Sequence, residues 1–141
     1  MAESGPAPDR DDSAIVERLM RLPELHRGVP VLSAMQRFAR MECLVGTFAA
    51  GVHLDIRSGE IVAVAPGPVR MKSWDFAFRA TPEAWCEHWR PVPRTGFHDI
   101  LALTKRGLAT VEGDMQPFLA NLQFFKDLVA LPRSEAHGAS A

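Results

Sequence analysis

The sequence predicts an α+β domain in which an antiparallel-dominated sheet of about four to five strands has one face covered by helices. Two observations support this fold class. Several short segments alternate apolar and polar residues, as half-buried strands do, and apolar residues at helical spacing occur before, between and after them. A sheet with one polar face needs helices stacked on its other face, and the chain supplies them.

A single domain is expected over residues 12–133 of the 141-residue chain. Residues 1–11 combine proline, alanine and charge, and residues 134–141 are small and polar, so both are expected to be disordered tails. The acidic start lacks the basic and apolar regions of a signal peptide. No apolar run reaches the roughly 18 residues of a membrane span. We therefore expect a cytoplasmic protein without integral membrane association.

The first elements are predicted to be helices. Asp12 or Ser13 can cap a helix that runs to Arg21, and Pro23 is expected to end it. A second short helical pattern follows over residues 31–38.

Three strands are predicted next, as a meander. Residues 41–48, 52–57 and 61–64 are expected to pair, with Gly59 supplying the positive φ of a tight turn before the third strand. The middle strand alternates clearly, which predicts a buried face and a solvent-facing one. The residues expected on its solvent face are His53, Asp55 and Arg57.

The second half of the chain alternates strands and helices. WDFAFRA, residues 74–80, is predicted to be a strand, and Thr81 caps a helix that Pro91 closes. Residues 97–107 predict a helix with Gly107 at its end, followed by a strand over 108–113. Asp114 then caps one long helix over residues 115–131, whose apolar residues form a wide stripe.

Four motifs in residues 52–131 resemble the sterol carrier protein domain family. They are the RSGE hairpin, the segment FAFRATPEAW, the helix start FHDILAL, and the strand, corner and helix of LATVEGDMQPFLANLQFF. The resemblance implies a sheet covered by helices, with an apolar tunnel between the layers that takes fatty acyl chains, sterols or related lipids without catalysis. Gly113 and Asp114 match the corner of the family, where their roles are structural.

A lipid-like small molecule is therefore the expected partner. Candidates for lining an apolar pocket come from the last three predicted helices: Trp85, Trp89, Phe97, Ile100, Leu101, Met115, Phe118, Leu119, Leu122 and Phe125. Three cations are candidates for meeting a headgroup: Arg79, Arg94 and Lys105. The plainer interpretation is that the apolar residues fill the core and that the three cations are solvated surface charges.

Other function classes find little support. The 16 Lys and Arg balance 17 Asp and Glu, so no overall field attracts nucleic acid. Cys43 and Cys86 fit neither a redox nor a zinc motif. His98 and Asp99 are adjacent on a predicted helix and so point apart. The sequence has no nucleophile elbow, dinucleotide-binding motif or phosphate-binding loop, and we expect no metal, cofactor or catalytic residue.

Two alternatives remain open. The first is an accessory interaction or oligomerisation module, acting on a partner enzyme or as a homodimer. The second is a small cone-shaped α+β acid–base enzyme, although in such folds the helices mostly precede the sheet, whereas here a long helix is predicted to close the chain.

Overall fold

The computed structural model describes residues 10–30, 38–67 and 73–133. In these ranges the strands are β1 (Met41–Gly46), β2 (Gly51–Arg57), β3 (Glu60–Gly67), β4 (Phe76–Ala80) and β5 (Ala109–Gly113). The helices are α1 (Arg10–Met20), α2 (Leu22–Arg27), α4 (Pro82–His88), α5 (Ile100–Lys105), α6 (Met115–Ala120) and α7 (Leu122–Val129).

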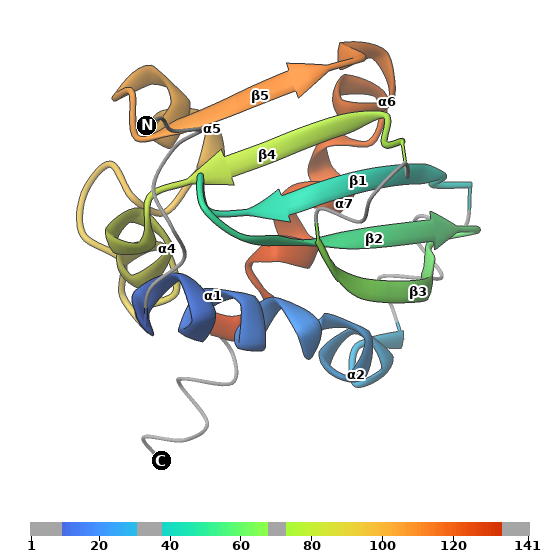
Figure 1. Cartoon of the computed structure of the whole chain (residues 1–141), viewed down its shortest axis with the longest axis horizontal. Coiled ribbons are helices and arrows are strands. Elements are labelled where there is room, and N and C mark those ends of the chain that lie inside the picture. The colour runs from blue at the N-terminus through green and yellow to red at the C-terminus, as the bar shows by residue number, and fades with distance from the viewer. Residues whose placement is uncertain (1–9, 31–37, 68–72, 134–141) are drawn as a thin grey trace, which may run out of the picture.

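The predicted α+β class is confirmed. The strands form one sheet in the order β3-β2-β1-β4-β5 (Figure 1), in which β1 and β4 run parallel and every other pair is antiparallel. Every second residue of the strands points to the same sheet face, and these residues form one hydrophobic core with residues of the helices. Among them are Cys43, Leu54, Phe76 and Phe78. The helices therefore pack on this one face.

The start of the chain differs in detail from the prediction. Helix α1 already begins at Arg10, so Asp12 lies inside its first turn and is buried rather than capping it. Pro23 does not end this helix but stands in the first turn of α2, where its missing amide loses no hydrogen bond. The helix predicted over residues 31–38 and the two tails lie almost wholly outside the described residues.

The hairpin between β2 and β3 is confirmed. Ser58 and Gly59 both have positive φ, 54° and 76°, which is the pattern of the two-residue turn that matches the twist of a hairpin. Strand β3 is longer than predicted and extends on both sides of residues 61–64.

The prediction for His53 was wrong, because the side chain is only 3 % exposed. Its cross-strand neighbour Leu44, and Ala77 next to Leu44 on β4, are buried as well. Asp55 is half-buried and Arg57 is exposed. The alternation assigned the face correctly, but along β2 this second face is buried at His53 and opens to solvent only from Asp55 onward.

Two helix caps in the second half were read correctly from the sequence. The Thr81 hydroxyl accepts a hydrogen bond from the Ala84 amide, 3.1 Å away, at the start of α4. Gly107 follows α5 with φ of +77°. Helix α5 begins three residues later than predicted, because the Asp99 carboxylate accepts from the Leu101 amide at 2.9 Å and serves as its N-cap.

The corner after β5 is also confirmed. Gly113 has φ of +104°, and Asp114 accepts from the Gln116 amide at 3.0 Å. The single long helix predicted after it was wrong, because Asn121 divides it into α6 and α7. Asn121 has φ of −117° and ψ of 26°, and its side-chain amide donates to the Pro117 carbonyl at 2.9 Å.

The core between sheet and helices contains a continuous chain of aromatic rings. Successive centroids lie 4.9 to 5.9 Å apart. In order from α4 to α6 the rings belong to Trp89, Trp85, Phe78, Phe125, Phe76 and Phe118. All six are fully buried, so the centre of the domain is closely packed.

Candidate functional site

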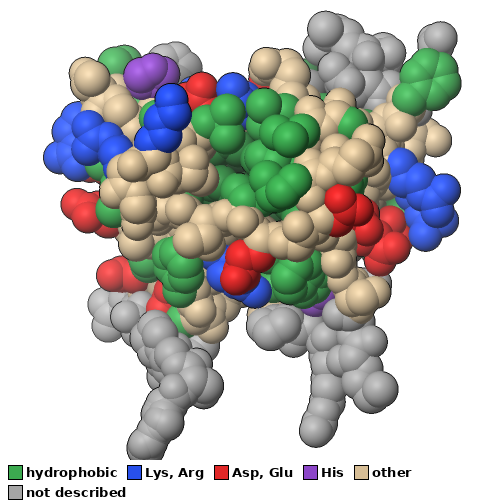
Figure 2. All heavy atoms as spheres, turned by 90° about the horizontal axis from the view of Figure 1, so that it is seen from above, with side chains coloured by type: hydrophobic (Ala, Val, Ile, Leu, Met, Phe, Trp, Pro, Cys, Tyr) green, Lys and Arg blue, Asp and Glu red, His purple; other side chains and the backbone are tan. Residues whose placement is uncertain are grey.

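An apolar patch lies at the β5 edge of the sheet, on the side that carries the helices. Figure 2 looks onto this edge and shows hydrophobic side chains gathered in the middle of the face, with charged side chains around them. The patch consists of Leu101 on α5, Val111 on β5, Met115 and Leu119 on α6, and Leu122 on α7.

The patch is the exposed margin of the core. Val111 lies opposite the core residue Phe78 in the strand register, yet it is only half-buried because β5 is the last strand of the sheet. Leu119 is 58 % and Met115 39 % exposed, while Phe118 between them is fully buried and joins the aromatic chain. Apolar surface therefore continues from the outside of α6 to the interior.

A polar hollow of about 290 Å³ lies between the start of α5 and the outer face of α7. Most of its wall is charged or polar: His88, His98, Asp99, Gln123, Lys126, Asp127 and Arg133. Ile100 and Ala130 supply the apolar part. Helices α5 and α7 each contribute to both regions: Ile100 and Gln123 line the hollow, and the neighbouring residues Leu101 and Leu122 belong to the apolar patch.

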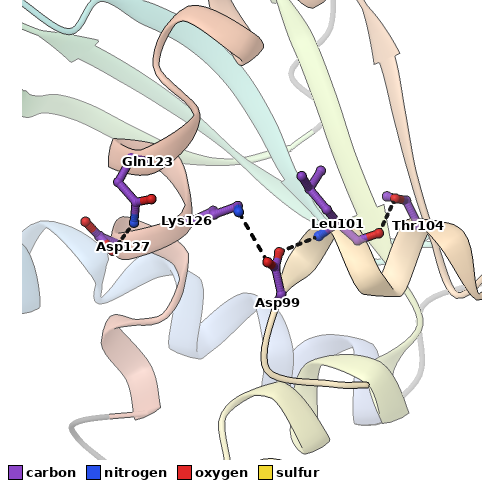
Figure 3. A network of polar contacts seen from close by, with 6 residues as sticks. All are labelled: Asp99, Leu101, Thr104, Gln123, Lys126 and Asp127. Carbon is purple, nitrogen blue, oxygen red and sulfur yellow. Dashed lines mark hydrogen bonds and ion pairs between the residues drawn. The ribbon is translucent and has the colours of Figure 1, made fainter. Parts of the chain in front are cut away.

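An ion pair between α5 and α7 crosses the polar hollow. Lys126 Nζ lies 3.2 Å from Asp99 Oδ2, and Figure 3 shows Lys126 reaching from α7 to Asp99, beside Leu101. Burial alone would raise the pKa of Asp99, but the hydrogen bonds from the Leu101 amide and Lys126 bring it below its usual value. The side chain of Asp99 is 40 % exposed and that of Lys126 is 26 % exposed, so water screens the ion pair.

His88 and Arg133 lie side by side in the wall of the hollow. His88 is 2 % exposed, and its Nδ1 lies 2.8 Å from the Phe97 carbonyl, to which it must donate. Burial lowers the pKa of His88 to about 4, so the ring is neutral at pH 7. Arg133 Nε donates to the His88 carbonyl at 2.9 Å.

The predicted headgroup cations do not lie together. Arg79 follows Phe78 on β4, so it projects from the opposite sheet face, where it pairs with Glu112 and contacts the Trp74 ring. Arg94 lies over the Phe97 ring at 4.6 Å, with its Nε 3.9 Å from Glu87. Lys105 is exposed in the last turn of α5.

The predicted pocket residues divide into groups. Trp85, Trp89, Phe118 and Phe125 belong to the aromatic chain, and Leu101, Met115, Leu119 and Leu122 belong to the apolar patch. Phe97 and Ile100 are buried near the hollow. Both indole N–H groups are bonded inside the core, Trp85 to the Gly46 carbonyl and Trp89 to the Val129 carbonyl, which gives them a packing role.

Sequence reasoning missed the polar hollow. Lys126 and Asp99 are 27 residues apart, and Arg133 and His88 are 45 apart, so no local pattern brings them together.

Within the described ranges, no three His, Cys, Asp or Glu side chains are grouped to hold a metal ion. Burial raises the pKa of both cysteines, Cys43 and Cys86. None of the described helices is long and apolar enough to cross a membrane.

Comparisons with solved structures find the same fold. A crystal structure of sterol carrier protein 2 superposes with a TM-score of 0.63 at 16 % identity, covering 89 % of this chain and 98 % of that one. A conserved hypothetical protein from Thermus thermophilus, described as possibly a sterol carrier protein, has a TM-score of 0.56 at 14 % identity and covers 93 % and 95 %.

A third similar structure is the UbiJ-SCP2 ubiquinone synthesis protein. Its TM-score is 0.51 at 18 % identity, and the match covers 82 % of this chain and 91 % of that one. No protein-family model matches the sequence, and no curated protein matches it significantly. At these identities the likeness concerns the fold, and the chain has the sterol carrier protein fold.

Proposed function

We propose that this protein binds and carries an apolar or amphipathic small molecule, of the fatty acyl, sterol or related lipid type, without changing it chemically. The ligand inserts between α5, α6 and the β5 end of the sheet. The observation that carries this proposal is the apolar patch, which joins exposed side chains of α6 directly to the buried aromatic chain.

The patch supplies the opening and the aromatic chain the inner wall. Phe118 lies on the short helix α6, which Asn121 separates from α7. Because α6 is a single short element with two exposed apolar residues, a small outward movement of it would separate Phe118 from Phe76 and Phe125. An acyl chain would fill the space that this movement opens.

The fold likeness agrees with this use of the site. One of the similar structures is named a sterol carrier protein, and another is described as possibly one. The free cysteines Cys43 and Cys86 suit a reducing compartment, so the proposed setting is the cytoplasm.

Titration with a series of primary alkanols of increasing length, followed by isothermal calorimetry, tests the proposal. Burial contributes about 0.8 kcal/mol per CH₂, so the Kd should fall about fourfold for each added CH₂ until the site is full. Leu122→Trp places a larger side chain in the opening and Phe118→Trp a larger ring in the inner wall, and both should abolish binding. Val92→Trp, at a loop position that is 82 % exposed, is the matched control and should bind as the unmodified protein does.

An accessory interaction module is the second candidate function, since the same exposed Met115 and Leu119 could contact a partner protein. In that case the alkanols would not bind. Leu119→Asp would weaken association, measured by light scattering over a range of protein concentrations.

A further inference from the structure

We propose that the ligand carries an anionic headgroup, a carboxylate or a phosphate, and that Lys126 binds this group in the polar hollow with Arg133 as the second cation. This inference rests on the proposed function and specifies the ligand class of the same site. The hollow and the apolar patch share their two walls, α5 and α7, so one molecule can occupy both.

Lys126 is placed at the boundary between the two regions. Its helix carries Leu122 one turn earlier, in the patch, and Ala130 one turn later, in the hollow. An acyl chain that enters through the patch would therefore present its polar end to the Lys126 ammonium. Figure 3 shows the Lys126 side chain directed from α7 toward Asp99, across the polar hollow.

The ion pair with Asp99 does not prevent this role. The pair is partly exposed, and pairs of this kind contribute little to stability, so a ligand anion can compete with Asp99. Lys126 also has three donors, of which Asp99 uses one. Asp99 remains bonded to the Leu101 amide when Lys126 turns to the ligand.

Of the two cations that line the hollow, Lys126 has a carboxylate partner, Asp99, whereas Arg133 has no such partner among the described residues. Its Nη2 faces His88 Nδ1 at 3.3 Å, but Nδ1 already donates to the Phe97 carbonyl and cannot accept. Among the residues that the structure describes, no carboxylate forms an ion pair with Arg133. Its positive charge thus lies at the wall of the hollow beside a neutral imidazole.

The two carboxylates in the wall are already hydrogen-bonded. Asp99 accepts from Leu101 and Lys126, and Asp127 accepts from Gln123 at 3.0 Å. Lys126 compensates the charge of Asp99, whereas the neutral Gln123 amide leaves the charge of Asp127 in place. A ligand anion would therefore bind through the donors of Lys126 and Arg133 and against the charge of Asp127.

The test compares a saturated fatty acid with the primary alcohol of the same chain length, at pH 7.5 and low salt. The unmodified protein should bind the acid about tenfold to a hundredfold more tightly, as expected for a charge-assisted hydrogen bond. Lys126→Met should reduce this preference at least severalfold, because it weakens binding of the acid far more than binding of the alcohol, and Lys126→Met combined with Arg133→Met should remove it. Asp99→Asn keeps an N-cap for α5 but frees Lys126, so it should strengthen binding of the acid.

Arg57→Met is the matched control. Arg57 is also a cation in a partly exposed ion pair, with Asp55 at 3.2 Å, but it lies at the far end of β2. It should leave the preference intact. The same titrations with an alkyl phosphate distinguish the two anionic headgroups.

The outcomes separate the two proposals. If the unmodified protein binds neither acid nor alcohol, the proposed function fails. If it binds both equally, or if the preference for the acid is undiminished in Lys126→Met, the headgroup inference is overturned while the proposed function stands. A decrease of acid binding in Asp99→Asn would also overturn it, independently of any folding defect in the lysine variant.

Discussion

The indole N–H of Trp89 donates to the carbonyl oxygen of Val129 at 2.7 Å, which ties the end of α4 to the end of α7. Both residues are buried, and Arg18 of α1 lies over the Trp89 ring at 4.7 Å. Three helices that are far apart in the sequence therefore meet at one indole. This contact fixes α7, which carries both Leu122 and Lys126 of the proposed site.

Replacement of Trp89 by Phe should destabilise the domain. The Val129 carbonyl would lose its partner inside the core, which costs about 1 to 3 kcal/mol. Urea denaturation followed by circular dichroism measures the change. Trp74→Phe, at a half-buried position on the other sheet face, is the control; an equal loss in the two variants would refute the importance of the Trp89 bond.

The corner before α6 should tolerate no side chain. A Cβ at Gly113, where φ is +104°, would lie 2.5 Å from the Asp75 carbonyl oxygen, so Gly113→Ala should cost at least about 2 kcal/mol. Gly107→Ala is a matched control, because Gly107 also has positive φ but a Cβ there meets nothing within 4 Å. It should cost only about 1 kcal/mol. Thermal unfolding of the two variants gives the comparison, and equal losses would show that the close approach to Asp75 is unimportant.

Stability should fall at mildly acidic pH. Burial lowers the pKa of His88 from 6.5 to about 4, so between these values the unfolded chain takes up a proton that the folded chain does not. The resulting loss of unfolding free energy is absent above pH 6.5 and grows as the pH falls. It levels off below about pH 4, at no more than about 3 kcal/mol. His26, whose pKa burial also lowers, acts in the same direction.

Denaturation midpoints across this range, measured for His88→Asn and His98→Asn, isolate the effect. The His88 variant should lose part of the acid sensitivity, since Asn can still donate to the Phe97 carbonyl but does not titrate. His98 is exposed, and its variant should follow the unmodified protein. Parallel curves for all three proteins would be incompatible with this role of His88.

The sequence-based predictions succeeded where a local backbone requirement dictates the residue. Thr81 before Pro82, Gly59 in the hairpin and Gly113 before Asp114 each meet a need set within a few residues. They failed where the outcome depends on distant packing. The apolar stripe over residues 115–131 spans both α6 and α7, and nothing in its periodicity marks the break at Asn121.

The candidate site divides in the same way. Helical spacing correctly indicated that Phe118 and Phe125 face the sheet, but it did not reveal that Met115 and Leu119 are exposed. That any of these residues lines a pocket stays a prediction. The polar hollow was not identified, since Lys126 meets Asp99 only after α5 and α7 have packed on the same sheet. For the same reason Arg79 and Lys105 could be recognised as cations but not placed relative to a pocket.

Native mass spectrometry of the protein as purified from cells, followed by organic extraction, tests the proposed function most directly. The proposal predicts a stoichiometric bound molecule with a long apolar part, which is lost in Leu122→Trp and retained in Val92→Trp. A mass equal to that of the protein alone, together with no binding of fatty acids or sterols on titration, would contradict it.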